Sequence, residues 1–467
     1  MSPRPPPGRQ SPFPPVLPLA HPATGDAALQ HTQKSIFRFW FPLAATWVMM
    51  ALEGPFLAAV IARLADQEFN LAAWGVAYAF AMLVESPVIM LMSASTALAD
   101  SAANFRRLRT FTYALSAGVT AVMLLVLTPP VFRFVMLEII SLPERVAHLA
   151  YVGLWLLLPW PGAIGIRRFY QGVLIRDGRT RLVALGTVFR LSTMAGTALV
   201  LALAVRPAGA YVGAAALAMG VSAEAIASVW MARASVRRVL QTEGPGEDPE
   251  GPLSYRRIVA FYYPLALTSI IGLAVQPMLT FFMGRAPATV ESLAVFPVVT
   301  AATFLFRSLG LSYQEVAIAL MGRRFEHARE LSRFALVLGI VASAGLAALA
   351  LTPLSTLWFQ TVSGLSPTLA RFAVTPTAVL VPIPLLAVVL SFQRAILVIA
   401  QRTRLISWAT AIEVTVIALA FPLFGWKIGI VGVTAASVAL LAGRIGSTGY
   451  LLRPCAAAIR RAARAAA

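Results

Sequence analysis

Two short stretches decide the fold: FWFPLAAT at positions 39–46 and FYYPLALT at positions 261–268, the same motif at an offset of 222 residues. Further matches keep this order and spacing. They are Pro55 with Pro277, Arg63 with Arg285, LAAWGV at 71–76 with LAVFPV at 293–298, LTP at 127–129 with 351–353, Pro159 and Pro161 with Pro382 and Pro384, and RTRL at 179–182 with 402–405. Chance similarity between apolar segments would not preserve the spacing, so the chain contains an internal repeat.

The composition predicts a polytopic membrane protein. Of the 467 residues, 59% are apolar and only 12% are charged, whereas soluble domains carry about a quarter charged residues. So few charges cannot cover a water-exposed surface of this size. The single cysteine, Cys455, permits neither an internal disulfide nor a thiolate metal site. A cytosolic enzyme, a disordered protein and a secreted disulfide scaffold are therefore excluded.

Twelve apolar stretches are close to the roughly 20 residues that a helix needs to cross a bilayer. The first six are Phe37–Ala62, Asn70–Leu98, Thr110–Leu127, Val146–Ile166, Leu182–Val205 and Ala208–Met231. The second six are Ile258–Met283, Glu291–Leu320, Phe334–Leu351, Phe372–Leu390, Leu405–Phe421 and Ile428–Leu451. We therefore predict an all-α protein of twelve transmembrane helices.

The basic residues are distributed unevenly between the two ends of these spans. The two tails and the connections that follow spans 2, 4, 6, 8 and 10 hold 28 of the 38 Lys and Arg residues. The connections that follow the odd-numbered spans hold seven. By the positive-inside rule, both termini are cytoplasmic in a multi-pass protein of the cell (cytoplasmic or inner) membrane. The net charge of +19 follows from these short clusters, so the lipid bilayer and not nucleic acid is the expected partner.

The segments outside the spans divide the chain into five parts. Residues 1–34 form a Pro-rich tail without a secretory signal, expected to be disordered; an organelle transit peptide is the alternative. Six-helix bundles occupy 35–241 and 253–453, a cytoplasmic linker (TEGPGEDPEGP) lies at 242–252, and a basic tail follows at 454–467. An even number of helices makes the repeats parallel, which predicts a central cleft and alternating access to it.

This arrangement resembles the multidrug and toxic compound extrusion (MATE) fold of the multidrug/oligosaccharidyl-lipid/polysaccharide (MOP) exporter superfamily. FWFPLAAT, LAAWGVAYAF and FYYPLALT are most similar to the progressive ankylosis (ANK) branch. The resemblance implies an exporter, of drugs or cations for MATE proteins and of small organic or phosphate-type anions for the ANK branch. The major facilitator alternative is disfavoured because the loop ADSAANFRRLR lacks its Gly-x-x-x-Asp-Arg-type signature. Lipid II flippases resemble 14-helix bundles, two helices more than this chain has.

Four ionisable residues are predicted to form two intramembrane ion pairs. Arg190 and Glu224 lie at equal depths in the fifth and sixth spans, and Glu413 and Arg444 repeat the arrangement with reversed sign. All lie roughly 10–12 Å from the cytoplasmic ends at 1.5 Å per residue. A structural pair within each hairpin and a role in gating or substrate binding both remain open.

Four further polar residues are candidates for the central cleft or a gate. Glu85 and Arg307 occupy equivalent positions and could face each other across the cleft, or extend separately to the cytoplasmic interface. Gln276 precedes Pro277 in the seventh span. Glu315 lies nearer the cytoplasmic end, where a solvated position is the alternative.

Glu53 is the candidate coupling site. It lies two residues before Pro55, and its repeat counterpart is the apolar Val275. Proline leaves a backbone carbonyl without its donor, and such a carbonyl beside a carboxylate can hold Na⁺ or H⁺. The alternative is a protonated glutamate hydrogen-bonded in the core.

The remaining motifs favour transport over catalysis. The four histidines are far apart, and the sequence has no metal-ligand cluster, nucleophile elbow or phosphate-binding loop. We expect no enzyme, metal or cofactor, apart from H⁺ or Na⁺ as coupling ion. The predicted function is export of a small organic solute, anions included, by a monomeric secondary active transporter. The alternatives are a flippase for a lipid-linked substrate and a non-transporting membrane scaffold.

Overall fold

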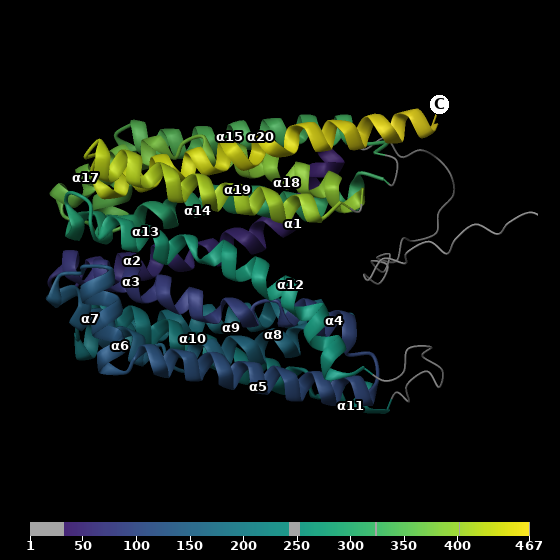
Figure 1. Ribbon diagram of the computed structural model, residues 1–467, viewed down its shortest axis with the longest axis horizontal. Helices are drawn as coiled ribbons and strands as arrows, with labels where there is room; N and C mark the ends of the chain where they lie inside the picture. The colour runs from purple at the N-terminus through teal and green to yellow at the C-terminus, as the bar shows by residue number, and fades with distance from the viewer. Residues whose placement is uncertain (1–31, 242–252, 323–324, 401, 467) are drawn as a thin grey trace, which may run out of the picture. The chain divides into compact units, whose positions relative to one another are not determined.

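The structure is a computed structural model that describes residues 32–241, 253–322, 325–400 and 402–466 (Figure 1). The predicted tail up to residue 31 and the predicted linker at 242–252 lie outside the described residues. The described part contains twelve helices that are long and apolar enough to cross a membrane. The prediction of an all-α protein with twelve spans is therefore confirmed.

The first repeat contains spans one to six, several of them interrupted. Its α-helices are α1 (Gln33–Ala51), α2 (Glu53–Ala62), α3 (Gln67–Glu85), α4 (Leu91–Leu98), α5 (Ala102–Val126), α6 (Pro129–Arg133), α7 (Glu144–Leu156), α8 (Trp160–Arg176), α9 (Thr180–Val200), α10 (Gly209–Met231) and α11 (Arg233–Gln241). A 3₁₀ turn, η1 (Ser86–Val88), joins α3 to α4. Two π-helices, η2 (Phe134–Ile139) and η3 (Leu201–Val205), continue α6 and α9.

The second repeat contains spans seven to twelve. Its α-helices are α12 (Tyr255–Leu273), α13 (Val275–Met283), α14 (Thr289–Leu320), α15 (Ala328–Leu351), α16 (Leu354–Thr356), α17 (Pro367–Val379), α18 (Ile383–Ile399), α19 (Arg404–Phe421) and α20 (Gly432–Ala466). Its π-helices are η4 (Leu357–Val362) and η5 (Pro422–Lys427). The helix α20 continues through residues 454–466, which were predicted to be a tail.

The fourth and tenth spans are longer than predicted. The fourth was expected to end at Ile166 and the tenth at Leu390, but they run to Arg176 and Ile399. Each is interrupted at its Pro-x-Pro motif, and a new helix, α8 or α18, begins there. Proline fits the first turn of a helix because its missing N–H has no partner there. Arg167, Arg168, Arg176 and Arg394, which follow the predicted ends of these spans, therefore lie inside helices.

The spans that begin the two repeats are both broken in the middle. The first span is interrupted at Leu52, between α1 and α2, and the seventh at Ala274, between α12 and α13. Pro55 and Pro277 lie in the turn after each break. Each proline leaves a carbonyl of the preceding turn without its helical donor. The second span is also interrupted, at the η1 turn that contains Pro87.

The repeated motif that opens each half makes contacts with the other half. Helix α1 packs against α14 and α15, and α12 packs against η1 and α5. Trp40 Nε1 donates a hydrogen bond to Ser312 Oγ at 2.9 Å. Its repeat counterpart Tyr262 donates to the Pro87 carbonyl. An aromatic donor at the same position of both motifs thus connects the two repeats.

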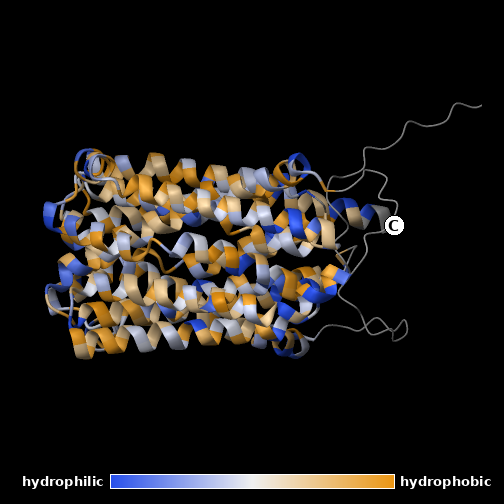
Figure 2. Cartoon of the chain, turned by 90° about the horizontal axis from the view of Figure 1, so that it is seen from below, coloured by the Kyte–Doolittle hydropathy of each residue, from blue (hydrophilic) through white to orange (hydrophobic). Residues whose placement is uncertain are grey.

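The exposed surface of the helices is apolar, as lipid requires. Leu203, Ile226 and Leu419 are 70%, 72% and 69% exposed. In Figure 2 the middle stretches of the helices are mainly hydrophobic, and hydrophilic residues gather toward their ends. Water-soluble proteins rarely expose contiguous apolar surface on this scale, so this surface is typical of contact with acyl chains.

Candidate functional site

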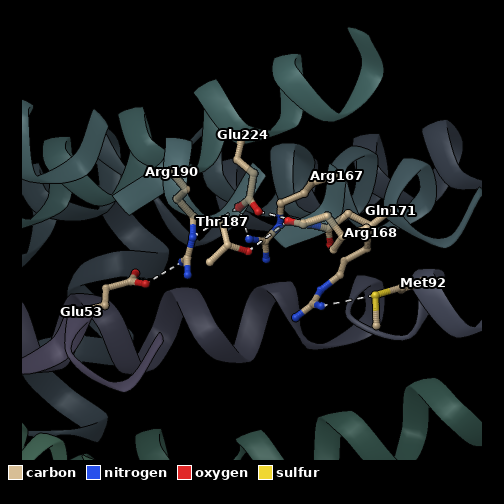
Figure 3. A network of polar contacts seen from close by, with 9 residues as sticks. Glu53, Met92, Arg167, Arg168, Gln171, Thr187, Arg190 and Glu224 are labelled. Carbon is tan, nitrogen blue, oxygen red and sulfur yellow. Dashed lines mark hydrogen bonds and ion pairs between the residues drawn. The ribbon is translucent and has the colours of Figure 1, made fainter. Parts of the chain in front are cut away.

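Arg190 on α9 is the centre of a buried charge cluster in the first repeat (Figure 3). Its Nη1 lies 2.6 Å from Glu53 Oε2, and its Nε lies 3.3 Å from Glu224 Oε2. The Arg190 residue is 8% exposed and Glu224 is fully buried. One guanidinium thus bridges carboxylates of α2 and α10. A buried charge without such partners would be strongly unfavourable.

Glu224 extends this cluster to α8. Its Oε2 accepts a hydrogen bond from Arg167 Nη1, and its Oε1 accepts one from Gln171 Nε2 at 3.1 Å. Because Arg167 and Gln171 are one helical turn apart, both reach the same carboxylate. The side chains of Glu53, Arg190, Glu224 and Arg167, each in contact with the next, therefore connect four helices. One of them, α2, begins at the break in the first span.

Glu85 and Arg168 border the same cluster, and neither forms an ion pair within the described part of the chain. Glu85 ends α3 next to the η1 turn and is 4% exposed, and its Oε2 has no hydrogen-bond partner among the described residues. Arg167 and Arg168 lie within electrostatic range of it. Arg168 Nη1 lies 3.7 Å from Met92 Sδ. The first-repeat cluster thus contains three carboxylates and three guanidiniums, so its formal charges balance.

The second repeat holds a different set of charges. Arg444 Nη2 lies 3.0 Å from Glu413 Oε1, and Ser447 Oγ donates to Glu413 Oε2 at 3.1 Å. Arg307 on α14 and Arg394 on α18 lie within electrostatic range of this pair. Arg307 also lies over the Phe304 ring, 5.1 Å from its centroid.

The second-repeat cluster has an excess of positive charge. Three guanidiniums, those of Arg307, Arg394 and Arg444, accompany the single carboxylate of Glu413. Within the described residues, Arg307 and Arg394 donate no side-chain hydrogen bond and form no ion pair within 4.0 Å. Ser447 is the repeat counterpart of Glu224, which removes one carboxylate from this half. The difference between the repeats is therefore one of charge, on the same helical framework.

The structure brings some of the candidate residues together and leaves others apart. Arg190 contacts Glu224, and Glu413 contacts Arg444, while Glu53 contacts Arg190. Glu85 and Arg307 form no ion pair with each other among the described residues. Glu315 on α14 lies close to the side chain of Trp47. Gln276 lies within α13 and Pro55 within α2, each directly after the break of its span.

Four residues of the clusters with charged or amide side chains were not anticipated from the sequence: Arg167, Arg168, Gln171 and Arg394. Each lies beyond the apolar stretch of its span, so the hydropathy pattern places it in the following loop. A signal was present. Between Pro161 and Asp177-Gly178 the sequence has only single glycines and no proline, so no turn signal ends the helix before Gly178, which has a positive φ of 73°. A helix that restarts at the Pro-x-Pro motif therefore carries these residues into the bundle.

We call the end of the bundle opposite the C-terminus the arginine-poor end. At this end, equivalent arginines of the two repeats each contact the other repeat. Arg63 Nη2 donates to the Thr361 and Val362 carbonyls of η4 at 2.6 and 3.0 Å. Its counterpart Arg285 donates from Nη2 to the Glu138 carbonyl of η2 at 3.3 Å. Terminal helix carbonyls lack intrahelical donors, so each arginine satisfies a carbonyl of the other repeat. We call this pair of contacts the arginine latch.

Solved structures of other proteins share the helical arrangement of this chain. No protein-family model matches the sequence, and neither does any curated protein sequence. An inward-facing multidrug resistance MATE family transporter of the MOP superfamily is similar, with a TM-score of 0.70 at 12% identity, covering 91% of this chain and 100% of that one. The chain has a MATE-like fold. Its structural neighbours are transporters and not enzymes.

Two other MOP-superfamily structures share the fold. The lipid II flippase MurJ in an inward closed conformation has a TM-score of 0.65 at 13% identity, covering 91% of this chain and 90% of that one. A MOP superfamily transporter from Pyrococcus furiosus has a TM-score of 0.61 at 14% identity, covering 92% and 97%. The likeness to the MOP fold thus extends over nearly the whole chain.

Proposed function

We propose that this protein is a secondary active transporter that exports a small organic anion across the cell membrane by alternating access between its two repeats. The MATE-like fold supports the transport part of this proposal, because MATE neighbours named as transporters share it. H⁺ or Na⁺ is the proposed coupling ion. Both termini are proposed to be cytoplasmic, from the distribution of Lys and Arg.

The positive second-repeat cluster is the observation that carries the choice of an anion. Arg307 and Arg394 are only partly buried and have no side-chain hydrogen-bond partner among the described residues, so their donors are available. A guanidinium binds carboxylate and phosphate oxygens in a forked geometry. Intramembrane ionisable groups are costly and mark substrate pathways by default. The ANK branch, to which the opening motifs are most similar, is consistent with the same substrate class.

Glu53 is the proposed coupling residue. It begins α2 directly after the break at Leu52, and it reaches Arg190. Binding of a proton or Na⁺ by Glu53 would weaken this ion pair and release α2 from α9. Such a carboxylate contributes to coupling when its cation affinity differs between the two states of access.

Counterflow in proteoliposomes tests the proposed function. Vesicles containing the protein and a preloaded anion are diluted into a trace of the same labelled anion, for a panel of carboxylates and phosphate esters, with organic cations as the opposing panel. We expect at least one anion to exchange, and Arg394→Gln to raise its apparent KM about ten- to hundredfold, as loss of one charge-assisted hydrogen bond predicts. Arg404→Gln, at an exposed position on α19, is the matched control. Exchange of cations alone would refute the proposal.

A flippase for a lipid-linked substrate is the second candidate, favoured by the likeness to MurJ. A flippase would move a fluorescent lipid-linked phosphate between leaflets, and soluble anions would not exchange. Dithionite quenching of the outer leaflet in the same vesicles distinguishes the two functions. Vesicles that show neither activity would favour the scaffold alternative.

A further inference from the structure

A cavity of about 780 Å³ lies at the arginine-poor end, among residues of the first repeat. None of the residues of the two charge clusters lines it. Its polar wall is formed by Arg63, Asp66, Arg145, His148 and Arg206, together with Asn70. This volume is within the range of pockets that hold small molecules.

The charges around this cavity are predominantly positive. Three of its residues are arginines and one is aspartate, a formal net charge of +2 with His148 neutral. Only seven Lys and Arg residues occur in the connections of the arginine-poor end, so nearly half of them line one cavity. Arg145 is paired with Asp66 and lies over the Phe69 ring. The Arg206 side chain has no partner among the described residues.

Comparison with the second repeat shows that these charges are peculiar to the first. The counterparts of Asp66, Arg145 and Arg206 are Ala288, Thr368 and Gly429. All three counterparts are uncharged, so the repeated framework of the fold does not itself require charges at these positions.

Arg206 has a φ of 52° and Gly429 a φ of 80°, so the same left-handed turn is present twice. Glycine adopts this conformation readily, whereas a residue with a Cβ is strained in it. The first repeat therefore keeps an arginine where the backbone favours glycine. Strain of this kind is concentrated at binding sites.

Part of the cavity lining is apolar and belongs to the exposed surface of the helices. Leu199, Ala202 and Leu203, from the end of α9 and from η3, line the cavity. Leu199 and Leu203 are also 46% and 70% exposed on the outside of the helices. A ligand with an anionic headgroup and an acyl chain would satisfy both walls at once.

We propose that this cavity binds the phosphate group of an anionic ligand, held by the guanidiniums of Arg206 and Arg145. A phosphate can accept charge-assisted hydrogen bonds from both. Two sources share this chemistry, an anionic phospholipid of the surrounding leaflet and a soluble phosphate ester; the apolar wall favours the lipid. The proposal is independent of the transported substrate, because the cavity and the two clusters share no residue.

The apparent melting temperature of the purified full-length protein in neutral detergent tests this proposal. The additives are phosphatidylglycerol, phosphatidylcholine with the same acyl chains, and glycerol 3-phosphate. The test variant is Arg206→Gly, which suits the left-handed turn and should leave the fold intact. The matched control is Arg371→Gln, an exposed arginine at the same end that does not line the cavity.

We expect phosphatidylglycerol to raise the melting temperature more than phosphatidylcholine does. Arg206→Gly should weaken the apparent affinity for it about ten- to hundredfold, the effect of losing one charge-assisted hydrogen bond, and Arg371→Gln should not. Stabilisation by glycerol 3-phosphate that is lost in Arg206→Gly would support the site and identify a soluble ligand. Equal effects of the two lipids without any effect of glycerol 3-phosphate, or a response that Arg206→Gly leaves unchanged, would overturn the proposal.

Discussion

Exchange of the two charges in the fifth and sixth spans should fail to restore the fold. If α9 and α10 were a hairpin with no other charged neighbour, Arg190→Glu combined with Glu224→Arg would preserve their ion pair. The structure adds a further partner to each residue. Arg190 also contacts Glu53, and Glu224 also contacts Arg167. In the exchanged protein, a glutamate at position 190 therefore faces Glu53, and an arginine at position 224 faces Arg167.

The size of this effect follows from the distances and the burial. Removing one partner of a buried pair costs about 3–5 kcal/mol, so each single variant should be destabilised by that amount. Two like charges about 4 Å apart repel by about 4 kcal/mol at an effective dielectric constant of about 20. The exchange introduces two such repulsions in place of two attractions. We expect the double variant to be no more stable than either single variant.

The second repeat offers a matched exchange, Glu413→Arg with Arg444→Glu. There the pair contacts Ser447 and no second carboxylate among the described residues, so the exchanged pair should recover most of the stability lost in its single variants. The assay is the fraction of detergent-solubilised protein that remains monodisperse after heating, for both sets of variants. Recovery of the first-repeat exchange to the wild-type melting temperature would refute the four-residue arrangement.

Three other predictions concern coupling, the latch and the topology. Glu53→Gln should retain substrate exchange in proteoliposomes and lose uphill accumulation driven by a pH or Na⁺ gradient; full gradient-driven uptake would assign coupling elsewhere. Replacing Arg63 and Arg285 together by Gln removes three hydrogen bonds between the repeats, each contributing about 1.5–3 kcal/mol net because the donor is charged, so the repeats should separate more often at the arginine-poor end. Faster labelling of a cysteine introduced beside the latch would show this, and an unchanged rate would contradict it. A tag in the 242–252 linker should be cytoplasmic and one beside Arg206 external, as read by a membrane-impermeant reagent; both tags on one side would exclude the proposed topology.

The latch prediction has a control in the chain itself. Arg371 lies at the same end and donates to Pro367 within its own helix. Because this bond does not cross between the repeats, Arg371→Gln should leave the labelling rate unchanged. A similar acceleration in this variant would indicate a general effect of lost charge.

The sequence by itself determined the class, the number of spans and the repeat. Apolar stretches of about 20 residues are sufficient for this. Within a bilayer, a single apolar segment can satisfy its own backbone hydrogen bonds only by forming a helix. Pro55 and Pro277 also mark the turns that follow the breaks at Leu52 and Ala274, but Pro42, Pro264 and Pro297 lie inside uninterrupted helices, so proline alone does not locate a break. The class, the number of spans and the repeat depend on the local sequence alone.

Only the tertiary structure decided which charges meet. Sequence separation and depth suggested that Arg190 would contact Glu224, but they could not show that Glu53 and Arg167 join the same pair. Those two residues arrive from α2 and α8, whose rotation about their own axes is set by packing against neighbours. The sequence did not reveal the excess of positive charge around Arg394, because the predicted tenth span ends at Leu390, before this residue. Burying a charge costs free energy that a partner must offset, and the partners of Arg190 come from α2 and α10, which only the folded bundle brings together.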